Sequence, residues 1–113
     1  MPVQEAWDYY ISAHEREAPS WENRLTVASM ETIVGWNVVG HAHLVQQPLL
    51  VVHGTTDVLL PPRYAQQVYD EAPGPKTLHW IETHNHVELY DQAPFVPDAE
   101  AAMIEFLTTH LPA

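Results

Sequence analysis

The chain has 113 residues, enough for one domain, and its net charge is -11 because 15 acidic residues face only four lysines and arginines. That charge repels phosphate backbones and anionic bilayers, so we expect neither a nucleic-acid nor a membrane partner. Hydrophobic residues make up 46% of the sequence, which favours a packed core.

The absence of cysteine excludes disulfides, thiolate metal ligands and a cysteine nucleophile. No apolar run reaches the ~20 residues that cross a bilayer, and we expect a cytoplasmic protein without a signal peptide.

The first 45 residues are expected to form a helical part. Apolar side chains at helical spacing predict a helix over residues 4–14. The side chains at this spacing are Trp7, Tyr10, Ile11 and His14. An irregular connection follows, and a second helix is predicted over residues 29–39. Ser29 is expected to cap this second helix and Gly40 to end it.

The chain is organised around an apolar, β-branched-rich run between Pro48 and Gly54. A short apolar run closed by glycine predicts a strand over residues 48–53, buried on both faces. Asp57 follows this strand closely. Open α/β sheets place their chemistry at the carboxyl ends of the strands, so Asp57 is a candidate site residue.

The rest of the chain predicts a βαβ unit followed by a helix. Pro61 and Pro62 fit the first turn of a helix, and residues 76–82 read as a second strand. Strand, helix and strand in this order predict a right-handed unit with parallel strands. Residues 83–97 are expected to form a loop with one helical turn at residues 86–91. Asp98 is then expected to cap a last helix, which reaches about residue 111. Its inward side chains are expected to be Met103, Phe106, Leu107, His110 and Leu111.

Two adjacent parallel strands therefore deliver Asp57 and a histidine cluster to one edge of the sheet. A carboxylate beside an imidazole orients the ring, fixes its tautomer and stabilises its protonated form. The other ring nitrogen can then act as a general base. The 29 positions between Asp57 and His86, filled by one crossover helix, suit this geometry.

These motifs resemble the C-terminal third of an α/β-hydrolase, most of all the dienelactone-hydrolase-like and peptidase-like branch. The resemblance is strongest over residues 46–110. It is carried by Pro-Leu-Leu-Val-Val-His-Gly-Thr-Thr-Asp at residues 48–57 and His-Val-Glu-Leu-Tyr-Asp at residues 86–91. By this resemblance, Asp57 matches the acid and His86 the catalytic histidine of the family's triad. It implies attack on an ester, lactone or amide carbonyl, with Asp57 orienting His86.

The chain differs from that family because it lacks the nucleophile motif that should precede the acid. The family carries its nucleophile in Gly-x-Ser-x-Gly, and none of the three serines here lies in such a motif. No Gly-rich oxyanion loop is present, and Asn85 replaces the usual small residue before the histidine. We therefore expect little esterase activity from the chain alone.

Other interpretations stay open beside this one. Asp57 could merely cap the following helix or hold a turn. A metal site is also suggested by the nearby His84, His86, His53 and Glu88. The strand histidines His53 and His79 are expected to line the core. We expect no metal ligands and no cofactor.

Taken together, the sequence predicts a partial α/β-hydrolase fold, in which helices flank a short parallel sheet. It is expected to form one domain over residues 1–113, with a helical cap-like part over residues 1–45 and a βαβα part over residues 46–113. The favoured function is a hydrolase-family segment, either a natural truncation or one piece of a longer enzyme. The alternatives are a catalytically silent oligomerisation or small-molecule-binding module and, third, a His-rich metal binder. Two strands leave an apolar edge open, so we expect a homodimer or a pairing with a missing N-terminal hydrolase portion.

Overall fold

The computed structural model describes residues 4–12, 20, 22 and 24–111. The chain divides into two compact units, Met1–Val38 and Val39–Ala113. The predicted division into a helical part and a βαβα part of one domain stays a prediction. No helix in the described residues is both long enough and apolar enough to cross a membrane.

The first unit consists of short helices. Helix α1 (Gln4–Trp7) runs directly into η1 (Asp8–Ser12), a π-helical segment. Together they cover most of the predicted helix over residues 4–14, whose last two positions lie outside the described residues. Their junction is supported by a hydrogen bond from Gln4 Nε2 to Asp8 Oδ1 of 2.7 Å.

The second predicted helix starts earlier than expected and is interrupted. Helix α3 (Val27–Gly35) begins after Thr26, whose hydroxyl accepts a hydrogen bond from the Ser29 N–H at 3.3 Å. The prediction that Ser29 is the cap is therefore wrong, because Thr26 satisfies the exposed N–H of the first turn. Trp36 then adopts an extended backbone and ends α3. The helix α4 (Val38–His41) follows and contains Gly40, so Gly40 does not end the helix as predicted.

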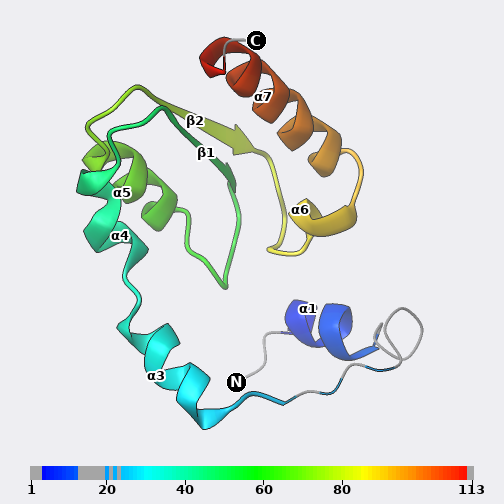
Figure 1. Ribbon diagram of the computed structural model, residues 1–113. Helices are drawn as coiled ribbons and strands as arrows, with labels where there is room; N and C mark the ends of the chain where they lie inside the picture. Colours follow the sequence, from blue (N-terminus) through cyan, green and yellow to red (C-terminus); the bar gives the residue numbers. More distant parts are fainter. Residues whose placement is uncertain (1–3, 13–19, 21, 23, 112–113) are drawn as a thin grey trace. The chain divides into compact units, whose positions relative to one another are not determined.

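The second unit contains the predicted βαβ arrangement. Strands β1 (Leu49–Gly54) and β2 (Lys76–Ile81) pair in parallel, in register from Leu49 with Lys76 to Gly54 with Ile81. Helix α5 (Arg63–Glu71) connects them. Figure 1 shows both arrowheads at the same end of the sheet. The α/β fold class, with a short parallel sheet flanked by helices, is confirmed.

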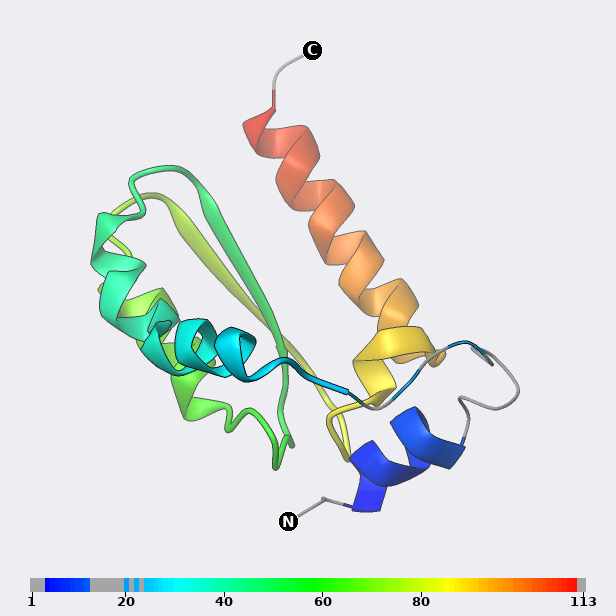
Figure 2. The same ribbon diagram turned by 60° about the horizontal axis from the view of Figure 1, so that its bottom comes forward.

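Helices cover both faces of this sheet. Helix α5 and the C-terminal helix α7 (Phe95–His110) each contact both strands. They lie on opposite faces in both views (Figures 1 and 2). The buried apolar core is small, because no large side chain of the described residues is fully buried. Its members are Ala42, Ala65, Ala72, Ile81 and Val87.

The chain reaches α7 through a single turn, α6 (Glu88–Asp91). Asp98 was predicted to cap the last helix, but α7 starts at Phe95 and Asp98 lies inside its first turn. Its carboxylate instead lies 3.0 Å from His79 Nε2 on β2. Pro97 also stands in this first turn, which tolerates proline because no N–H is required there.

The inward face of α7 differs from the prediction in part. Phe106 and His110 are half-buried as expected, whereas Met103, Leu107 and Leu111 are exposed. The inward row is completed by Ala99 and Ala102, which are also half-buried. Met103, Leu107 and Leu111 stay exposed because the sheet is narrow. Two strands present enough surface to cover one row of side chains on a helix and no more.

Candidate active site

The side chains of Asp57 and His86 meet beyond the carboxyl ends of the two strands. His86 Nδ1 lies 2.7 Å from Asp57 Oδ2. Both side chains are largely enclosed, with 8% of the Asp57 side chain and 13% of the His86 side chain exposed. The expected contact is therefore present, brought about by two parallel strands that end at the same edge. The catalytic roles of the two residues stay predictions.

The second carboxylate oxygen of Asp57 is held by the backbone. Asp57 Oδ1 accepts hydrogen bonds from the N–H of Leu59 at 2.9 Å and the N–H of Leu60 at 2.7 Å. Burial alone raises the pKa of Asp57, but the hydrogen bond and charge of His86 together with these two N–H groups outweigh it. The pKa of Asp57 is therefore lowered. Asp57 thus holds its own loop in shape and stays ionised beside the imidazole.

Thr83 ties the loop after β1 to the loop after β2. Its hydroxyl donates to the Thr56 carbonyl at 3.0 Å and accepts from the Thr56 N–H at 3.2 Å. Its own N–H donates to Thr55 Oγ1 at 3.2 Å, and the Thr55 N–H extends the ladder to the Ile81 carbonyl at 2.8 Å. Only 3% of Thr83 is exposed. These bonds fix the separation of the two loops that carry Asp57 and His86. No motif in the sequence indicates this role of Thr83.

A second set of hydrogen bonds shapes the loop that carries His86. Asn85 Oδ1 accepts from the N–H groups of Val87 and Glu88, both at 3.1 Å. The buried Glu88 carboxylate reaches back and accepts from the His84 N–H at 2.7 Å and from Asn85 Nδ2 at 3.3 Å. This reciprocal arrangement works like a capping box. Asn85, which departs from the resembled family, therefore has a structural role in holding the turn.

Tyr90 provides a third group that sequence reasoning did not identify. Its hydroxyl lies 2.7 Å from His86 Nε2, and the two rings meet edge to face with centroids 5.2 Å apart. Asp57, His86 and Tyr90 form a continuous chain of hydrogen-bonding groups. The available signal was the four-residue spacing between His86 and Tyr90 across a predicted helical turn.

His53 and His84 do not join His86 in one metal-binding cluster. His53 borders the site, with Nε2 4.0 Å from Asp57 Oδ2 and Nδ1 bonded to the Gly54 carbonyl at 2.8 Å. His84 Nδ1 faces Glu88 Oε1 at 3.3 Å, whereas His86 faces Asp57. Within the described part of the chain, no group of three or more His, Cys, Asp or Glu side chains is placed to hold a metal ion.

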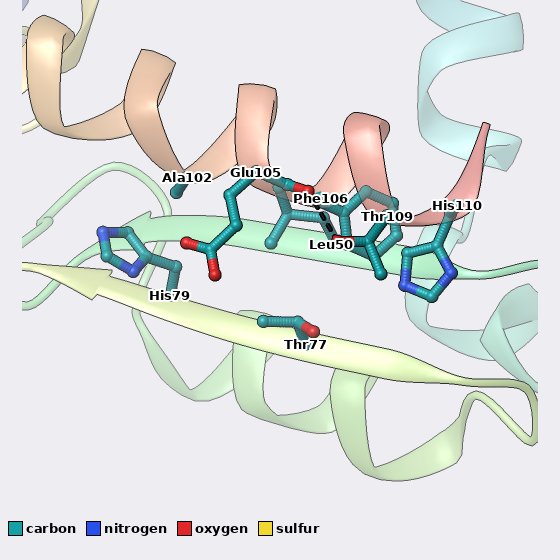
Figure 3. A pocket seen from close by; sticks show the side chains of 8 residues that line it. All are labelled: Leu50, Thr77, His79, Ala102, Glu105, Phe106, Thr109 and His110. Carbon is teal, nitrogen blue, oxygen red and sulfur yellow. Dashed lines mark hydrogen bonds between the residues drawn. The ribbon is translucent and has the colours of Figure 1, made fainter. Parts of the chain in front are cut away.

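A separate cavity of about 270 Å³ lies between α7 and the sheet (Figure 3). The Glu105 carboxylate and the His79 ring lie toward one end and the His110 ring toward the other. The other lining residues are Leu50, Thr77, Ala102, Phe106 and Thr109. Neither Asp57 nor His86 lines this cavity, so it is distinct from the candidate active site.

Comparison with known proteins gives a distant relationship. No family model matches the chain. A protein named thiohydrolase from Eupenicillium brefeldianum is 28% identical over 90 residues, which cover 79% of this chain. The aligned region covers 29% of the length of that relative. The similarity supports a hydrolase-like relationship.

Proposed function

We propose that this chain is an α/β-hydrolase-like protein in which Asp57 and His86 form the acid and base of an acyl-hydrolysing site. Asp57 accepts a hydrogen bond from the Nδ1–H of His86, which leaves Nε2 free of a proton. Nε2 can then take a proton from an attacking hydroxyl or water. The substrate would be a carbonyl compound of the ester, lactone or amide class. Because the distant relative is named a thiohydrolase, thioesters join these substrates.

One observation carries this proposal, the 2.7 Å contact between His86 Nδ1 and Asp57 Oδ2. The lowered pKa of Asp57 supports it, because an ionised carboxylate accepts the Nδ1 proton and stabilises an imidazolium. The backbone donors on Asp57 Oδ1 leave Oδ2 directed at the ring. The contact, the lowered pKa and the backbone donors are all features of the acid and histidine of a catalytic triad.

The nucleophile half of a serine triad is missing from this sequence. No Gly-x-Ser-x-Gly stands among the 113 residues. The chain alone should therefore turn over slowly. A serine supplied by a further hydrolase portion would restore full activity, since triad members act as a unit.

A catalytically silent oligomerisation or binding module is the second candidate, and exposed apolar side chains favour it. Three consecutive residues after Asp57 are both large and exposed, namely Val58, Leu59 and Leu60. Together with a two-stranded sheet they offer a surface for association. This candidate needs no proton transfer at His86.

Hydrolysis of p-nitrophenyl acetate and of an aryl thioester by matched variants separates the two candidates. Asp57→Asn and His86→Gln should remove the slow turnover if the pair acts as acid and base. The matched controls are Asp98→Asn and His79→Gln, because those residues form another carboxylate–histidine pair at 3.0 Å outside the site. Turnover that is equal in all four variants would contradict the hydrolase proposal and favour the silent module.

A further inference from the structure

The hydroxyl of Tyr90 occupies the place at His86 where a nucleophile must stand. An activated nucleophile is recognised by a hydroxyl within about 2.6–3.2 Å of a base that a third group orients. Tyr90 Oη lies 2.7 Å from His86 Nε2, and His86 Nδ1 lies 2.7 Å from Asp57 Oδ2. The chain therefore contains a complete hydroxyl, imidazole and carboxylate series without a serine.

The donor and the acceptor in each hydrogen bond of His86 follow from the chemistry of Asp57 and Tyr90. The ionised Asp57 carboxylate can only accept a hydrogen bond, so His86 Nδ1 is the donor. In the neutral ring Nε2 is then an acceptor, and the Tyr90 hydroxyl donates to it. This is the arrangement in which an imidazole removes a proton from an attacking hydroxyl.

We propose that Tyr90 is an acyl-accepting nucleophile, activated by His86, for small activated esters and thioesters. This inference rests on the proposed function, because it uses the same base. Tyr90 Oη attacks the carbonyl carbon while its proton passes to His86 Nε2. The bond from that carbon to the leaving oxygen or sulfur then breaks, and the proton passes from Nε2 to the departing group. The product is an ester of Tyr90 together with the released phenol or thiol.

The surroundings of Tyr90 fit this role. Tyr90 is 44% exposed, which leaves part of the residue open to a small acyl donor. The turn α6 that carries Tyr90 is held by the hydrogen bonds of Asn85 and Glu88, which limits the motion of the hydroxyl relative to Nε2. Because the sequence has no Gly-rich oxyanion loop, release of the acyl group to water should be slow. The expected behaviour is the transfer of one acyl group to each chain, followed by slow turnover.

The chain offers a matched control in Tyr64. Tyr64 is 42% exposed, close to the value for Tyr90, but its hydroxyl accepts a hydrogen bond from Arg63 Nη2 at 3.1 Å. Tyr64 therefore reports the reactivity of an accessible tyrosine whose partner is a cation and not a base. Any difference between the two tyrosines measures the effect of the environment at His86.

The experiment incubates the 113-residue chain with p-nitrophenyl acetate and, in parallel, with S-phenyl thioacetate. After an acid quench, peptide mass spectrometry measures acetylation at each tyrosine over time. Tyr90 should be acetylated about 100-fold faster than Tyr64, which is the lower end of what a positioned general base contributes. His86→Gln should reduce the Tyr90 rate to that of Tyr64. Tyr90→Phe should abolish the initial burst of p-nitrophenol, whereas Tyr64→Phe should leave it unchanged.

Two results overturn the inference, and they differ in what else they overturn. If Tyr90 is acetylated no faster than Tyr64 while hydrolysis still depends on His86, the nucleophile is not Tyr90 and the proposed hydrolase function survives. If neither acetylation nor hydrolysis depends on His86, both proposals fail. Far-UV circular dichroism and urea unfolding of each variant show that the comparison is made between folded chains.

Discussion

Gly54 and Thr83 pack so closely that the glycine has no room for a side chain. A Cβ atom on Gly54 would overlap Oγ1 of Thr83 and lie 3.0 Å from its Cγ2. Gly54 is the last residue of β1, and Thr83 lies in the loop that leads to His86. The absence of a side chain at one position thus allows the hydrogen bonds that hold Asp57 and His86 at one edge.

Gly54→Ala should therefore destabilise the second unit by about 1–3 kcal/mol, the usual cost of inserting a methyl group into a well-packed place. Thr83 is buried, short and branched, so its side chain cannot rotate away without losing the hydroxyl's bonds to the N–H and carbonyl of Thr56. Urea unfolding measures the effect. The control is Gly35→Ala, because a Cβ there meets nothing within 4 Å. Equal midpoints for the two variants would contradict the packing argument.

Thr83→Val removes the hydroxyl while keeping the shape of the side chain. The N–H and carbonyl of Thr56 then lose their partner in two part-buried hydrogen bonds, which should cost about 1–3 kcal/mol. Any hydrolysis or Tyr90 acylation that depends on His86 should fall as well. Thr109→Val is the control, since the Thr109 hydroxyl donates to the Glu105 carbonyl in an exposed hydrogen bond within α7. A Thr83→Val chain as stable as the Thr109→Val chain would rule out the tie between the loops.

The lowered pKa of Asp57 predicts a specific dependence of stability on pH. The unfolded carboxyl group, with a pKa of about 3.9, binds a proton at higher pH than the folded one. The stabilisation is therefore fully present above that value and is lost as the pH falls through the folded pKa. Asp57→Asn should be less stable than the parent chain at pH 6, and the difference should shrink below about pH 4. Urea unfolding between pH 6 and pH 3 measures this, and a constant difference would contradict it.

The open edge of β1 predicts association of this chain. The sheet in the described residues has two strands, and β1 pairs with β2 along one side only. Parallel sheets are normally covered and extended by further strands, and an unpaired apolar edge attracts another chain. Light scattering coupled to gel filtration should give about twice 12.8 kDa at micromolar concentration. Hydrogen exchange should then show protected amides in β1. A 12.8 kDa species that persists on concentration would contradict the dimer.

The sequence by itself determined the βαβ unit and the meeting of Asp57 with His86. An apolar run closed by Gly54 and a helix that begins after Pro62 are local patterns, and parallel strands joined by one crossover must end at the same edge. A residue that follows each strand is therefore brought to that edge whatever the details of packing. This is why Asp57 and His86 could be paired across 29 positions.

Only the tertiary structure decided the contacts that refine this site. The hydrogen bond from Thr83 to Thr56 and the fit of Thr83 against Gly54 depend on how closely the two loops approach each other. The contact of the Tyr90 hydroxyl with His86 Nε2 depends on the rotamers of both side chains, which the four-residue spacing allows but does not fix. The inward face of α7 likewise depends on the width of the sheet beneath it. Because the sheet has two strands, Met103 is exposed and does not face inward as predicted. Sequence periodicity fixes which residues share a face of an element. It cannot fix which neighbour that face meets, because close packing is decided by the whole set of side chains at once.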